Sequence, residues 1–143
     1  MKLISIILPK YLDVFWKDLK PLCEKSVPYT YGRYKVEDMY DIIMSGSHHL
    51  WVAQIDGVFK GIVITNIITY PQKTYLAMQF CGGFDLKEWK NEMLSKLRKF
   101  AIDMNCDGIE STGRKGWEKI FSKNGYKANW VTYELPLKEA ANG

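Results

Sequence analysis

The sequence predicts an α/β protein of the α+β kind, with one mixed, mostly antiparallel sheet and helices on both faces. The expected elements follow the order β-α-α-β-β-β-α-β-α-β, which excludes helical bundles and pure β-meanders. The 143 residues suit one hydrophobic core, and 47% hydrophobic with 25% charged residues is ordinary for a globular protein. The 14% aromatic content argues against disorder. We expect one domain over residues 1–137 and a flexible tail over 138–143.

The first quarter of the chain predicts one strand and two helices. A β-branched and leucine run over 2–8, stopped by Pro9, predicts a buried strand. Apolar residues then recur at helical spacing from residue 10, and Pro21 is expected to end or kink this helix at Lys20. After a tyrosine-rich loop, a second helical stripe begins at Val36 and closes at Ser45-Gly46.

The middle of the chain predicts three strands and the longest helix. Strands are expected over 50–55, 58–70 and 74–80, the first two joined by the hairpin dipeptide Asp56-Gly57. A turn containing Gly82-Gly83 then leads into a helix over 86–104. Asp85 is placed to cap that helix, with Glu88 at the capping-box position.

The end of the chain predicts a strand, a short helix and a last strand. The break at 105–108 precedes a strand over 108–112. A helix is expected over 113–123, ended by Asn124-Gly125 as a left-handed cap. The final strand is expected over 126–135.

Several classes of protein are excluded by composition. There is no run of about 18 apolar residues to span a membrane, and the apolar start is too short for a signal-peptide core. Cys23, Cys81 and Cys106 lack metal-ligand spacing, so we expect buried thiols in a reducing compartment. The two histidines, His48 and His49, cannot form a histidine-rich metal site, so no metal is expected. We therefore expect a cytoplasmic protein.

Two segments carry a resemblance to a known family. They are the Gly82-Gly83 turn before a long helix and the stretch from Gly113 to Tyr126, GRKGWEKIFSKNGY. Together with the element order, they resemble the GNAT (GCN5-related N-acetyltransferase) superfamily of acetyl-CoA-dependent N-acyltransferases. The pattern GG…EML…GRKGW…GY is most similar to short GNAT-like proteins of tailed phages. The resemblance covers roughly the last two-thirds of the chain.

The resemblance implies a cofactor site for acetyl-CoA. It places Gly82, Gly83 and Phe84 in the pyrophosphate loop, where glycines and a helix N-terminus suit a phosphate. It also places Arg114 and Phe121 on the short helix that closes the cofactor site. An arginine there suits a phosphate or a pantetheine carbonyl.

The same comparison shows departures from the family pattern, and no catalytic residue is assigned. Phe84 stands where a small residue is usual, and Phe121 stands where the family has the tyrosine that protonates the leaving thiolate. The strand over 74–80 holds no carboxylate base. Glu110 is the nearest alternative, although a solvent-facing structural role is favoured for it. His48 and His49 are interpreted as loop residues rather than a base.

Three functions therefore remain open. The first is an acyl-CoA-dependent N-acyltransferase with weak or degenerate catalysis, acting on a small-molecule or protein amine. The alternative is a non-catalytic phage virion-associated or assembly protein on the same fold, in the host cytoplasm or the virion, whose partner is a phage structural protein. The third, nucleic-acid binding through the basic stripe at 114–127, is least favoured because the net charge is only +4 and no recognition motif accompanies it. The tyrosines at 29, 31 and 34 either line an acceptor groove or form a packed loop.

Overall fold

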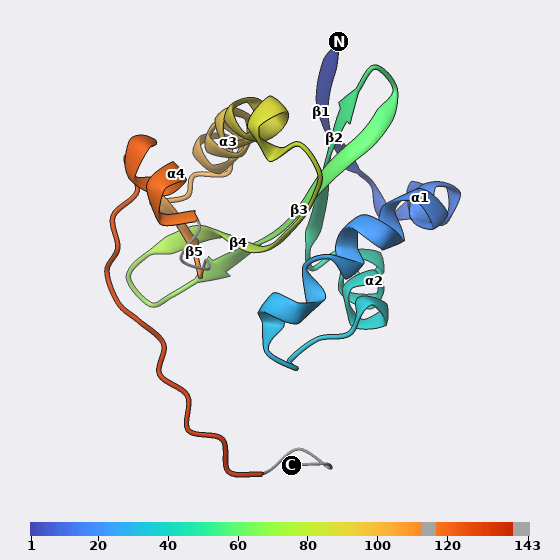
Figure 1. The fold of residues 1–143 in the computed structure, drawn as a ribbon. Helices are drawn as coiled ribbons and strands as arrows, with labels where there is room; N and C mark the ends of the chain where they lie inside the picture. Colours follow the sequence, from blue (N-terminus) through green and yellow to red (C-terminus); the bar gives the residue numbers. More distant parts are fainter. Residues whose placement is uncertain (113–116, 139–143) are drawn as a thin grey trace. The chain divides into compact units, whose positions relative to one another are not determined.

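The computed structural model describes residues 1–112 and 117–138, which belong to two units divided between Thr112 and Gly113. The first unit contains a five-stranded mixed sheet in the order β1-β2-β3-β4-β5 (Figure 1). The first four strands are antiparallel neighbours, and β5 is parallel to β4. Their bounds are β1 Lys2–Ile7, β2 His49–Ile55, β3 Val58–Thr69, β4 Thr74–Gly83 and β5 Gly108–Ser111.

Helices cover both faces of this sheet, as the sequence predicts. The first unit contains α1 Leu12–Glu24, α2 Val36–Met44 and α3 Leu86–Asp103, with short 3-10 turns at Pro9–Tyr11 and Val27–Thr30. Successive strand residues point to opposite faces. Leu50 and Val52 of β2 therefore pack with α1 and α2, whereas Trp51 contacts Phe100 of α3. Figure 1 shows α1 and α2 together on one side of the sheet and α3 on the other.

The hairpin between β2 and β3 confirms the expected turn. Asp56 and Gly57 both have positive φ, 51° and 81°, the conformation of a type I′ turn. Glycine adopts this conformation without a Cβ penalty, and aspartate is among the few other residues that tolerate it. The Met1 amino group also pairs with the Asp56 carboxylate, which lowers the pKa of that carboxyl.

The structure corrects the expectation that Pro21 ends or kinks its helix at Lys20. Helix α1 continues through Pro21 to Glu24. A proline inside a helix removes one backbone hydrogen bond. Here the residues that follow it, Leu22 and Cys23, are buried in the core, so continuing the helix buries apolar surface that compensates for the lost bond.

Strand β4 is longer than predicted. Gly82 pairs with Ile62 and Gly83 with Gly61, so both glycines extend the strand rather than forming a turn. Neighbouring backbone explains why neither carries a side chain. A Cβ on Gly82 would lie 2.2 Å from the Leu22 carbonyl oxygen, and one on Gly83 would lie 2.3 Å from the Lys60 carbonyl oxygen.

The second unit contains one short helix in its described part, α4 Glu118–Lys123. The first residues of the predicted helix, 113–116, lie outside the described residues. The strand predicted over 126–135 is wrong, because the described residues 126–138 form no strand. Apolar side chains in that segment are 70–91% exposed, namely Trp130, Val131, Tyr133, Leu135 and Leu137. A favourable residue pattern does not make a strand unless a neighbour supplies the backbone ladder.

The helices of the described residues include none that is both long and apolar enough to cross a membrane. The three cysteines are free thiols. Cys23 is fully buried, whereas Cys81 and Cys106 are half-buried. Burial raises the pKa of the Cys23 thiol to about 12, so this side chain packs as a small apolar group.

Candidate functional site

Strand β5 ends halfway along β4. Their parallel pairing runs from Tyr75↔Gly108 to Met78↔Ser111, and β4 then continues through residues 79–83. The Ser111 hydroxyl donates a 3.0 Å hydrogen bond to the Met78 carbonyl oxygen, which fixes the last paired position. Within residues 1–112, the edge of β4 beyond Met78 is unpaired on its β5 side.

A β-bulge in β4 directly follows its last pair with β5. Ile64 pairs with Phe80 and Thr65 with Met78, which leaves Gln79 as an extra residue of β4. A bulge changes the direction of its side chains. The Oε1 atom of Gln79 lies 2.8 Å from Nε2 of His48.

His48 is therefore brought to the middle of β4 from the loop that precedes β2. Its Nδ1 atom lies 2.8 Å from the Ser47 hydroxyl oxygen. Burial lowers the pKa of His48, and the hydrogen bond to Gln79 acts in the opposite direction. His48 does lie in a loop, as expected from the sequence, but its contact with Gln79 was not expected, because no local pattern links residues 48 and 79.

His49 points to the opposite face of the sheet and has a structural environment. Its Nδ1 atom lies 3.1 Å from the Thr65 hydroxyl, which also accepts a 3.0 Å hydrogen bond from the indole N–H of Trp51. Its ring contacts Phe100 of α3 edge to face, with centroids 5.1 Å apart. Burial is the main cause that lowers the pKa of His49.

A second bulge directs Lys60 of β3 toward the β4–α3 connection. Ala53 pairs with Gly61 and Gln54 with Phe59, so Lys60 is the extra residue. Its carbonyl oxygen accepts a 2.7 Å hydrogen bond from the Phe84 N–H. Its ammonium group forms a 3.3 Å ion pair with the Asp85 carboxylate.

The first turn of α3 is fixed to this connection by Trp89. The indole N–H donates a 2.8 Å hydrogen bond to the Phe84 carbonyl oxygen. The ring occupies the space above Gly61, where an added Cβ would lie 2.1 Å from a ring atom. Gly61 therefore allows the indole to reach the loop.

The N-terminus of α3 has the properties of an anion site. Asp85 occupies the N-cap position as predicted, with φ 53°, but its side chain makes no capping hydrogen bond and pairs with Lys60 instead. The expected capping box with Glu88 is therefore wrong. The first N–H groups of a helix lack intrahelical partners and lie at the positive end of its dipole. Two cations lie close by: Lys60, and Lys25, whose ammonium group lies 3.7 Å from the centroid of the half-exposed Phe84 ring.

The remaining residues singled out from the sequence are dispersed. Arg114 lies outside the described residues. Phe121 packs inside the second unit, stacked on Trp117 at 5.3 Å and in contact with Tyr126 at 4.9 Å between ring centroids. Glu110 is half-buried and accepts a 2.6 Å hydrogen bond from the Tyr70 hydroxyl, so it is not simply a solvent-facing residue.

The tyrosine-rich loop is only partly packed. Tyr34 contacts the ring of Phe80 edge to face at 4.8 Å, next to the bulge in β4. Tyr29 and Tyr31 are exposed. The structure thus brings one of the three tyrosines to β4.

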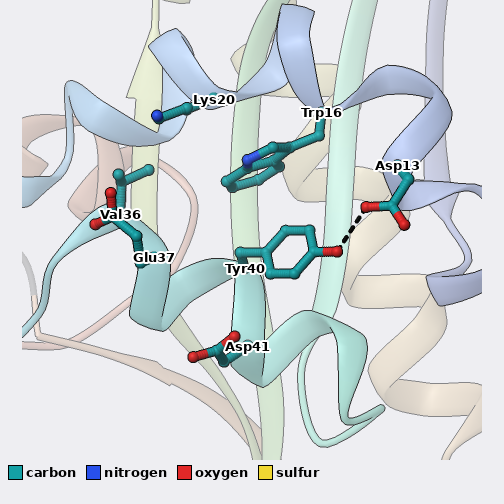
Figure 2. A pocket seen from close by; sticks show the side chains of 7 residues that line it. All are labelled: Asp13, Trp16, Lys20, Val36, Glu37, Tyr40 and Asp41. Carbon is teal, nitrogen blue, oxygen red and sulfur yellow. Dashed lines mark hydrogen bonds between the residues drawn. The ribbon is translucent and has the colours of Figure 1, made fainter.

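A separate hollow of about 340 Å³ lies between α1 and α2 (Figure 2). Trp16 and Tyr40 pack edge to face at 5.2 Å, and the Tyr40 hydroxyl donates a 2.6 Å hydrogen bond to Asp13. This bond is the main cause that raises the pKa of Tyr40. All the lining residues come from α1 and α2: Asp13, Trp16, Lys20, Val36, Glu37, Tyr40 and Asp41. The hollow therefore includes no residue of β4 or β5.

No protein-family model matches this sequence, and no curated protein matches it. Solved structures do match its fold. A probable acetyltransferase superposes with a TM-score of 0.74 at 12% identity, covering 96% of this chain and 99% of that one. A predicted acetyltransferase with acetyl-CoA, from Clostridium acetobutylicum, gives a TM-score of 0.68 at 13% identity, covering 96% and 97%.

A third match is an aminoglycoside acetyltransferase from an uncultured soil metagenomic sample, in complex with sisomicin. Its TM-score is 0.68 at 11% identity, with 96% of this chain and 97% of that chain covered. These matches extend over almost the whole of each chain, and all three proteins are described as acetyltransferases. At 11–13% identity, these matches are matches of fold. The chain therefore has the GNAT fold, an α+β architecture built on a five-stranded mixed sheet.

Proposed function

We propose that this protein is an acyl-CoA-dependent N-acyltransferase that uses acetyl-CoA as its acyl donor. The observation that carries the proposal is that β4 continues for five residues beyond the Met78↔Ser111 pair, where β5 ends, and leads to an α3 N-terminus without a side-chain cap. The strand edge and the helix N-terminus therefore follow one another along the chain. An elongated molecule with a phosphate group and amide groups matches that combination.

Particular residues are proposed to hold acetyl-CoA. The first N–H groups of α3, with Lys25 and Lys60, would hold the pyrophosphate. The connection formed by Gly82, Gly83 and Phe84 would lie against it. The open edge of β4 would pair with the amides of the pantetheine arm. Bound acetyl-CoA would supply a thioester as the acetyl donor.

Two residues of the second unit are also proposed as cofactor residues, on the family resemblance. We assign Arg114 to a phosphate or a pantetheine carbonyl because a guanidinium suits oxyanions. Phe121 is assigned to an apolar contact with the cofactor, since its ring has no proton to donate. Weak catalysis is part of the proposal, because a leaving thiolate would receive no proton from Phe121.

The acceptor is proposed to be an amine, either a small molecule or a protein. The aminoglycoside acetyltransferase among the structural matches was solved in complex with sisomicin. This supports testing sisomicin among the first amines. Orientation of the amine against the thioester supplies much of the rate in such a reaction, so low activity does not require a full set of acid and base groups.

A thermal-shift titration with CoA tests the cofactor proposal. A ligand at 100 times its dissociation constant stabilises the folded state by about 2.7 kcal/mol, which corresponds to a rise in Tm of roughly 5–10 °C for a chain of this length. We expect Lys60→Gln to reduce the shift, because the lysine ammonium faces the anion site. Lys99→Gln is the matched control, since it removes another exposed ion pair, the one to Asp103. No shift for the native protein at millimolar CoA would contradict the proposal.

A second candidate is a non-catalytic assembly protein. It is supported by the exposed apolar side chains of residues 130–137, which suit a protein partner. The resemblance to phage proteins suggests a virion-associated role and a phage structural protein as that partner. Stable co-purification with an assembled particle, together with no CoA-dependent thermal shift, would favour this candidate over the transferase.

A further inference from the structure

We propose that His48 is the general base of the transfer reaction, the group that accepts the proton of the attacking amine. This inference rests on the proposed function. Its basis is position: His48 contacts Gln79, the first residue of β4 beyond the last pair with β5. In the proposed complex, a thioester held along β4 beyond Met78 would have its reactive end at this point. The attacking amine would then come within reach of the His48 ring.

The surroundings of the ring suit a proton acceptor. Burial lowers the pKa of His48, so the ring is neutral at physiological pH and carries one lone pair. Both ring nitrogens face oxygen atoms, Oε1 of Gln79 and the hydroxyl of Ser47. After it gains a proton, the ring can donate to both, which stabilises the charged product. Electrostatic repulsion from His48 helps to lower the pKa of the neighbouring His49, so the titration of one ring affects the other.

The nitrogen that faces β4 can be the one that accepts. The Ser47 hydroxyl donates to the carbonyl oxygen of Ile42 at 3.1 Å, so its oxygen is free to accept from an Nδ1–H. While Oε1 of Gln79 faces Nε2, that nitrogen carries the ring proton, because an amide oxygen only accepts. When the carboxamide moves away, the ring can take the Nδ1–H tautomer, which leaves the lone pair on Nε2. The Gln79 side chain is exposed, so an amine can displace its carboxamide from Nε2.

A nearby acceptor on β3 is also unsatisfied. Asn66 follows Thr65 on β3 and pairs with Ala77 of β4, two residues before Gln79. Its Oδ1 atom is buried and has no hydrogen-bond partner within the described part of the chain. An unpaired buried acceptor is costly, and an amine N–H would satisfy it. The carboxylate alternative is less suitable, because Glu110 already binds the Tyr70 hydroxyl.

In the proposed acetyl transfer, the amine nitrogen forms a bond to the acetyl carbonyl carbon, and the carbon–sulfur bond of the thioester breaks. The surplus proton of the nitrogen moves to His48, giving an imidazolium. CoA leaves as a thiolate and takes a proton from water, and the imidazolium later returns its proton to solvent. The products are an N-acetyl amine and free CoA.

The first test measures the histidine without turnover. Long-range ¹H–¹⁵N spectra of the full chain, with and without CoA, report the tautomer and the pKa of each imidazole. We expect the pKa of His48 to lie below the ordinary value of 6.5 and its signals to shift when CoA binds. A His48 signal that titrates at its ordinary pKa and does not respond to bound CoA would overturn the inference.

The second test is the pH profile of transfer from acetyl-CoA to sisomicin, spermidine or a lysine peptide. For the native protein, we expect kcat/KM to fall at low pH, with an apparent pKa equal to that measured for His48; this fall is the acid limb of the profile. For His48→Gln, we expect kcat to be lower by about 10²–10⁴-fold and the acid limb to be absent. His49→Gln should keep the limb, and the CoA-induced thermal shift should survive in His48→Gln. His48→Asn, with a circular dichroism spectrum of each variant, guards against misfolding.

The outcomes separate this inference from the proposed function. A His48→Gln variant that keeps both its rate and its acid limb overturns the inference. A native protein that binds CoA and acetylates none of these amines also overturns it, while the cofactor proposal stands. A native protein without a CoA-induced thermal shift contradicts the proposed function itself.

Discussion

The contact between Gly61 and Trp89 gives a quantitative test of how the β4–α3 connection is held. In Gly61→Ala, the new Cβ would lie 2.1, 2.5 and 2.7 Å from three atoms of the indole ring. Carbon atoms in contact sit about 3.5–4.0 Å apart, so the ring must move by about 1 Å or more. Trp89 is 1% exposed and is bonded to the Phe84 carbonyl, so it has little room to move. Overpacking of this kind costs about 1–3 kcal/mol.

A second substitution should partly relieve the clash. Trp89→Leu alone removes buried surface and one hydrogen bond, at a cost of roughly 3 kcal/mol. In the double variant with Gly61→Ala, the new methyl group no longer meets an indole ring. We therefore expect a favourable coupling energy of about 1–2 kcal/mol, within the range for residues in contact.

Urea unfolding of the four proteins measures this cycle. The expected result is a double variant about as stable as Trp89→Leu. Gly57→Ala is the control for glycine substitution, because Gly57 has φ 81° and nothing within 4 Å of an added Cβ. Its cost should be backbone strain alone, about 1 kcal/mol, and independent of residue 89. Additive effects of Gly61→Ala and Trp89→Leu would refute the packing argument.

Three further predictions concern single features. Ser111→Ala removes the hydroxyl that donates to the Met78 carbonyl and should lower the free energy of unfolding by about 0.5–1.5 kcal/mol in urea; an unchanged midpoint would contradict this. The thiol of Cys23, with its pKa raised to about 12 by burial, should react with a thiol reagent only after denaturant is added. The folded-state pKa values of His48 and His49 lie below the ordinary 6.5, so the unfolded chain binds more protons as the pH falls below about 6.5. Stability should therefore decrease from pH 7 to pH 5, and a chain with both histidines replaced by glutamine should lose less.

Much of the fold follows from local patterns. The Asp56-Gly57 turn and the apolar stripe of α3 lie where their patterns indicate, because turn chemistry and helical periodicity act over a few residues. The errors occur where distant contacts decide. Helix α1 passes Pro21 because Leu22 and Cys23 are buried by other elements, and β4 includes both glycines because β3 pairs with them.

The candidate site was less predictable for the same reason. The sequence pattern pointed to the β4–α3 connection, but it could not show that its two glycines also make room for neighbouring backbone. Lys60 and Gln79 are single extra residues in two bulges, and a bulge depends on the partner strand. The contact between His48 and Gln79 joins residues far apart in the chain, which no spacing rule describes.

The most direct test of the central proposal is an amide chemical-shift titration of the ¹⁵N-labelled full chain with CoA. We predict saturable shifts concentrated in residues 79–87, where the open edge of β4 meets the N-terminus of α3. Lys60→Gln should weaken these shifts, and Lys99→Gln should leave them unchanged. Shifts confined to the hollow between α1 and α2, or none at millimolar CoA, would contradict the acyl-CoA site.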